Sequence, residues 1–113
     1  MDLKMQTNMT PKEFVEGFYK EKQGLLDIYF KNYENSEVGN LIKSLDLKDD
    51  KEKTLKKILD FALTDTFYTV LLGLDGAASI GDKQEIYKLF DESGNELTGG
   101  KIEGYAWEYF QER

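Results

Sequence analysis

The chain has 113 residues, of which 40% are hydrophobic and 33% are charged, and its formal net charge is −7. A chain of this length can bury one hydrophobic core, so the composition predicts a single globular domain over residues 1–113. Because histidine and cysteine are both absent, Ser-His-Asp and Cys-His triads, thiol nucleophiles, zinc sites and haem ligation by these residues are excluded.

The composition also predicts where the protein is located and whether it binds nucleic acid. The start of the chain lacks the apolar stretch of a signal peptide, and the apolar run 67–74 is interrupted by polar residues and glycine. We therefore expect a cytoplasmic protein with no membrane partner, in which residues 1–9 form a loosely held segment. Arg113 is the single arginine and the lysines form no dense basic patch, so we expect no nucleic-acid partner either.

The negative charge lies entirely in the second half of the sequence. Residues 1–57 hold 11 acidic residues and 11 lysines, whereas residues 58–113 hold 11 acidic residues against 4 basic ones. Such a balance is typical of many acidic proteins. It would also speed the encounter with a positively charged protein surface, which makes a basic protein partner the more specific interpretation.

The strongest local signal is a helix start at residues 10–13. Thr10 suits the N-cap, Pro11 the first helical position, and Glu13 the third position of a capping box. Apolar residues then recur every three or four positions, which predicts a helix from residue 11 to about residue 33. Gly24 in its interior favours a break or a kink there.

Up to three further helices are expected before residue 74. Ser36 is placed to cap a short helix that carries Val38, Leu41, Ile42 and Leu45. Residues 46–57 resemble no calcium loop, because lysines occupy ligand positions, and instead suit the solvated start of a helix. The run 66–72 is rich in β-branched and aromatic residues and fits either a buried strand or a helix capped by Thr64 or Asp65; we favour the helix.

Seven of the ten glycines fall between residues 73 and 104, so turns and short elements are expected there. Residues 84–90 and 96–98 predict a small antiparallel β-hairpin around a turn at 91–95, with its first strand largely covered.

An aromatic C-terminal helix is predicted from helical spacing of Ile102, Tyr105, Ala106, Tyr109 and Phe110. The predicted fold class is therefore α+β, with a helical N-terminal two-thirds.

The glycine-rich loop 73–81 is one candidate site. Asp75, Ser79 and Asp82 offer polar groups, but the spacing matches neither a P-loop nor a dinucleotide-binding turn. A divalent-metal site from Asp75, Asp82 and Glu85 follows no established spacing, so we predict no metal and no cofactor. A tight connection built by glycines is the simpler interpretation of this loop.

The C-terminal segment is the other candidate. On a helical wheel Trp107 does not share the core face, so it either lies under another element, such as the predicted hairpin, or faces outwards. An outward Trp107 with Glu103, Tyr105, Glu108 and Glu112 nearby has the composition of a contact patch for a basic partner.

These observations favour a non-enzymatic, acidic protein-binding domain that neutralises or regulates a basic protein, as immunity proteins and antitoxins do. One alternative is a structural or accessory subunit of a homo- or hetero-oligomer, in which Tyr29, Phe30 and Tyr33 pack against another chain; a homodimer is compatible with the sequence. A third is a small enzyme or metal-dependent binder that uses the 73–81 loop.

Overall fold

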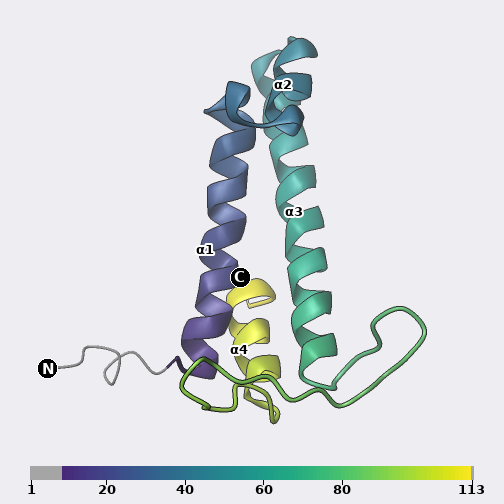
Figure 1. Ribbon diagram of the computed structural model, residues 1–113. Coiled ribbons are helices and arrows are strands. Elements are labelled where there is room, and N and C mark those ends of the chain that lie inside the picture. Colours follow the sequence, from purple (N-terminus) through teal and green to yellow (C-terminus); the bar gives the residue numbers. More distant parts are fainter. Residues whose placement is uncertain (1–8, 113) are drawn as a thin grey trace, which may run out of the picture. The chain divides into compact units, whose positions relative to one another are not determined.

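The computed structural model describes residues 9–112 and is helical throughout its regular structure (Figure 1). Its elements, in chain order, are α1 (Pro11–Phe30), the 3-10 turn η2 (Tyr33–Asn35), α2 (Glu37–Ser44), α3 (Asp49–Leu74) and α4 (Lys101–Phe110). The predicted α+β class is wrong, because residues 9–112 contain no strand that belongs to a sheet. The expected loose segment, residues 1–9, lies outside the described residues except for Met9.

The start of α1 is the capping box that the sequence predicts. The backbone N–H of Thr10 donates to Glu13 Oε1 at 3.0 Å, and the backbone N–H of Glu13 donates to Thr10 Oγ1 at 3.1 Å. Each side chain thus satisfies a backbone group that the first helical turn leaves unpaired. The helix continues through Gly24 without a break and ends at Phe30, three residues before the expected end.

The α2 helix begins as expected at Ser36, whose Oγ accepts a hydrogen bond from the backbone N–H of Gly39 at 2.9 Å. Gly39 and Ile42 are its buried residues. A Cβ atom at Gly39 would lie 2.6 Å from the carbonyl oxygen of Tyr33, so only glycine allows this close approach of α2 to η2.

A single helix, α3, covers residues for which the sequence predicts two segments. The run 66–72 is helical, and the helix passes through Thr64 and Asp65 rather than beginning at either of them. Thr64 is 2% exposed, and Leu71, two turns further on, is fully buried. Burial on a continuous helical face therefore outweighs the strand propensity of the β-branched and aromatic residues.

The predicted β-hairpin does not form. The chain does reverse over residues 91–95, but only an isolated bridge joins Phe90 to Glu96, and a second one joins Ile80 to Lys83. The expected cover is also absent, since Ile86 is 86% and Phe90 52% exposed. A two-stranded hairpin needs a buried face to be stable, and here the hydroxyl of Thr98, not a backbone carbonyl, accepts the hydrogen bond from the backbone N–H of Leu89.

The chain divides into two compact units, and α1 and α3 each contribute to both. The α4 unit comprises described residues 9–19 and 66–112. Its core is formed by buried aliphatic residues and Phe110, with aromatic rings packed around them; the fully or almost fully buried members are Val15, Leu71, Leu97, Ile102, Ala106 and Phe110. The core face predicted for the C-terminal helix thus lies inside this unit.

The α2 unit comprises residues 20–65 and has a core of its own. Leu26, Phe30 and Ile42 are its buried residues. Tyr29 and Tyr33 pack against them together with leucines of α3. Over residues 9–112, no helix combines the length and the apolar character that crossing a membrane requires.

Candidate protein-binding site

The α4 helix is held in its unit by one completely buried face. Ile102 and Ala106 are 0% exposed and Phe110 is 1% exposed. The ring of Phe110 contacts those of Tyr19 and Phe67, at centroid distances of 5.8 and 6.3 Å. Edge-on contacts of this kind add to the free energy gained from burial, so α4 has a fixed orientation within its unit.

Trp107 lies about 100° round the helix from the centre of this buried face, and its side chain is 54% exposed. Glu103 and Glu108 on the same helix are exposed, as is Glu112 just beyond its end. The alternative in which the hairpin covers Trp107 is therefore wrong. Of the five residues predicted for this patch, only Tyr105 turns towards the core, where it is half-buried.

Asp75, a candidate from the glycine-rich loop, holds the first turn of α4. Its Oδ1 accepts hydrogen bonds from the backbone N–H groups of Gly99 and Gly100, and its Oδ2 accepts one from Glu103, all at 2.9 Å. The residue at the N-cap position is Gly100, which has no side chain to do this. Asp75 thus replaces the missing cap, and its negative charge suits the N-terminal end of the helix dipole.

The other loop candidates, Ser79 and Asp82, are exposed. Among residues 9–112, no group of three or more acidic side chains has an arrangement that would hold a metal ion. Since three backbone donors already use both oxygens of Asp75, the geometry favours the structural interpretation of this loop over the chemical one.

Two side chains around α4 and the nearby turn show perturbed acidity. Partial burial raises the pKa of Tyr109, and the hydrogen bond that its hydroxyl donates to Glu16 at 3.0 Å raises it further. The backbone N–H and side-chain amide of Asn95 lower the pKa of Asp91, with smaller contributions from the N–H groups of Met9 and Ser93. Both side chains thus tie together distant parts of the α4 unit.

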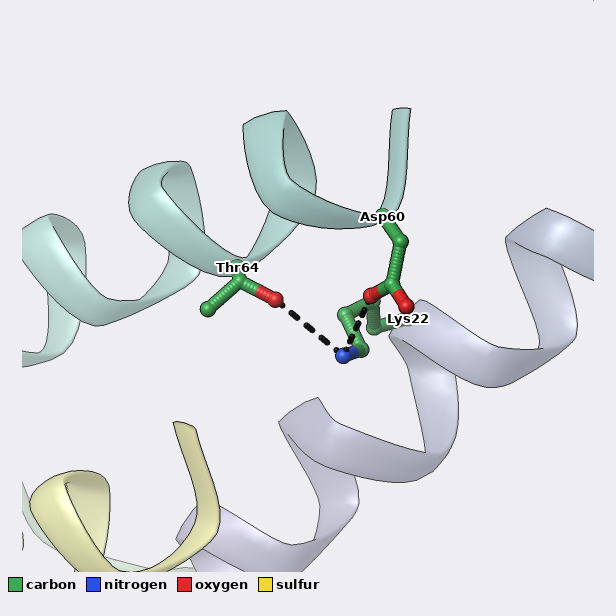
Figure 2. Close-up of polar contacts among 3 residues, drawn as sticks. All are labelled: Lys22, Asp60 and Thr64. Atoms are coloured by element: carbon green, nitrogen blue, oxygen red, sulfur yellow. Dashed lines mark hydrogen bonds and ion pairs between the residues drawn. The ribbon is translucent and has the colours of Figure 1, made fainter. Parts of the chain in front are cut away.

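A buried lysine in the α2 unit is the polar group that sequence reasoning missed. Lys22 of α1 is 2% exposed, and its Nζ lies 2.8 Å from Asp60 Oδ1 and 3.1 Å from Thr64 Oγ1 on α3 (Figure 2). The signal was present, because Lys22 occupies the apolar stripe four positions before Leu26. With a side chain only 3% exposed, Lys22 joins two helices and is not open to a ligand.

Surface hollows of about 230 and 170 Å³ also lie in the α2 unit. Both are lined by side chains of opposite charge, and Glu52 contributes to each. The lining of the larger one is Phe30, Lys31, Asp49, Glu52, Lys53 and Lys56. Mixed lining of this kind favours neither an anion nor a cation, so α4 remains the stronger candidate.

Comparison with known proteins adds no assignment: neither a protein-family model, nor a curated protein, nor a solved structure matches this chain.

Proposed function

We propose that the exposed face of α4 binds a basic protein, and that the chain is a non-enzymatic binding module of the immunity or antitoxin kind. The observation that carries this proposal is the exposure of Trp107, 54%, on a helix that is held in place by the buried residues Ile102, Ala106 and Phe110. Tryptophan is the residue type most typical of the energetically dominant positions in protein interfaces. An isolated large aromatic side chain in water gains most from a partner that covers it.

The rigidity of α4 supports the proposal. The buried side chains of Ile102, Ala106 and Phe110 hold the helix in the core of its unit. Asp75 fixes its first turn through hydrogen bonds. Trp107 is therefore presented on an ordered backbone. Binding then requires the ordering of little more than the side chain itself, which removes part of the entropic cost of association.

Charge supports a basic rather than an acidic partner. Over residues 9–19 and 66–112, the described part of the α4 unit, the sequence holds 11 acidic and 4 basic residues, whereas residues 20–65 hold 10 and 9. The negative charge is thus concentrated in the unit that carries Trp107. Such a distribution attracts a positively charged surface and repels acidic proteins, nucleic acid and anionic membrane.

The alternative of an accessory subunit was based on three aromatic residues that pack inside the chain. Phe30 is 7% exposed, and Tyr29 and Tyr33 pack with it in the core of the α2 unit. These side chains pack inside the α2 unit, so this alternative would depend on other apolar residues of the unit, such as Leu41 and Leu45, which are 67% and 59% exposed.

The test is affinity capture from the native host's lysate at about 50 and about 500 mM salt, because screening of surface charges differs strongly between these conditions. We expect a basic protein to be retained at low salt and released at high salt. The double variant Trp107→Ala with Glu108→Gln should retain it at least about tenfold less well, as expected for a dominant interface residue.

A matched control distinguishes binding at the Trp107 patch from general attraction to the negative charge of the unit. Phe90→Ala with Glu92→Gln removes an aromatic residue of similar exposure, 52%, and the same single negative charge from the same unit. Capture by this control should equal that of the native chain. Unchanged capture by a folded Trp107/Glu108 variant, or an equal loss in the control, would refute the proposed site.

A further inference from the structure

The helix surface one turn before Trp107 is open at a glycine, Gly104, and a second open glycine, Gly100, lies at the start of the same helix. Gly100 and Gly104 are both exposed, and a Cβ atom at either position would meet no atom within 4 Å. Gly104 lies inside α4, where glycine is less favourable than alanine. Packing therefore gives no reason for a glycine at this position.

Helical geometry places Trp107 and Glu108 at the edge of this opening. They follow Gly104 by three and four residues, the spacing of neighbours on one helical face. Side chains of a helix lean towards its N-terminus, so both lean over the turn that contains Gly104. Glu103 lies one turn before Trp107. We call the open surface at Gly104, with Trp107, Glu108 and Glu103 around it, the Gly104 notch.

Other open glycines show which part of this arrangement is unusual. Gly17 and Gly24 on α1 are also exposed, and a Cβ atom there would meet nothing within 4 Å. The residues three positions later are Lys20 and Asp27, however, and not an aromatic side chain. The Gly104 notch therefore differs from the open surfaces at Gly17 and Gly24 in one respect: an exposed indole and carboxylates lie around it.

We propose that the Gly104 notch receives an arginine side chain of the basic partner, an inference that rests on the function proposed above. A guanidinium group is planar, stacks on an indole face and donates paired hydrogen bonds to a carboxylate. Trp107 provides the face, and Glu103 and Glu108 provide the acceptors. A lysine ammonium satisfies the charge but has no plane with which to stack.

Trp107 provides the readout, because it is the single tryptophan of the chain. Its fluorescence is titrated at about 50 mM salt with two probes of equal charge, hexa-arginine and hexa-lysine. We expect hexa-arginine to bind about fivefold or more tightly, as stacking at a partly exposed site implies. Equal affinities would overturn the arginine inference.

A variant that fills the notch tests its position. Gly104→Leu should raise the melting temperature by about 2–6 °C, because leucine is the better helix former. The same variant should lose the preference for hexa-arginine. Gly17→Leu should raise the melting temperature as well but keep the preference, so it controls for helix stability. A Gly104→Leu chain that binds hexa-arginine like the native chain would contradict the inference.

The two proposals fail separately. If the Trp107/Glu108 variant loses the captured protein but the two peptides bind equally, the patch stands and the arginine inference falls. If hexa-arginine is preferred but that variant captures its protein as before, the proposed function falls instead.

Discussion

At the scale of single residues, Asp75 shows how a carboxylate can serve a helix that begins 26 positions later in the chain. Three backbone N–H groups at the start of α4 converge on it. A helix start whose N–H groups lack partners is destabilising, and Gly99 and Gly100 offer no side chain for the purpose. Asp75 therefore fixes the helix that presents Trp107.

We predict that Asp75→Ala lowers the free energy of unfolding by about 1–3 kcal/mol, the range for a lost helix cap with charged hydrogen bonds. Urea denaturation measures this change. Asp82→Ala is the control, since Asp82 is an exposed acidic residue beside the same loop, and should change stability by less than about 0.5 kcal/mol. Equal effects of the two substitutions would contradict the capping role.

Lys22 shows what the sequence can and cannot reveal at this scale. Its position on the apolar stripe of α1 is a signal that could have identified it as a lysine directed at a core, although sequence reasoning missed it. Its partners, Asp60 and Thr64, lie 38 and 42 residues away, and no local pattern selects them from 22 acidic residues. Likewise, the sequence excludes Trp107 from the core face of its helix, but only tertiary packing decides whether another segment covers it.

At the scale of elements, short-range signals predict helix starts well. The capping box at Thr10 and the cap at Ser36 each involve residues three positions apart, and both form as expected. The hairpin fails because the alternation in residues 84–90 is a local pattern without a core to cover it, as the exposure of Ile86 demonstrates. Glycines inside helices differ in this respect: packing decides at Gly39, where a Cβ atom would meet the backbone of Tyr33, and propensity decides at the open position Gly17.

Two glycine substitutions should therefore have opposite effects. Gly17→Ala should raise the free energy of unfolding by about 0.5–1 kcal/mol, because the position is open and helical. Gly39→Ala should lower it by about 1–3 kcal/mol, because the new Cβ atom would collide with the backbone of Tyr33, which cannot move aside cheaply. Denaturant titration of the two variants gives both values; a Gly39→Ala chain as stable as Gly17→Ala would show that α2 does not pack closely on η2.

At the scale of the whole molecule, each unit has a tyrosine that donates to a carboxylate. Tyr109 bonds Glu16 in the α4 unit, and Tyr33 bonds Glu52 at 3.2 Å in the α2 unit. Partial burial first, and then the carboxylate neighbour, raise the pKa of both hydroxyls above the ordinary value of 10.0. Asp91 behaves in the opposite sense, because its hydrogen bonds lower its pKa from 3.8.

These shifts predict the pH range over which the fold is most stable. The tyrosines contribute stability that is fully present below pH 10 and is lost as the pH rises through their raised pKa values, since ionisation removes the donated proton. Asp91 contributes stability that is present above about pH 4 and is lost as the pH falls through its lowered pKa. Stability should therefore be highest between these limits and fall on both sides.

The alkaline side is tested with the double variant Tyr33→Phe and Tyr109→Phe, which removes both hydroxyls and keeps both rings. Urea denaturation at about pH 7 and about pH 11 gives the loss of stability for each chain, and lysine deprotonation contributes to both chains alike. We expect the variant to be less stable at pH 7 and to lose less on going to pH 11. If both chains lose the same amount, the two hydrogen bonds do not set the alkaline limit of the fold.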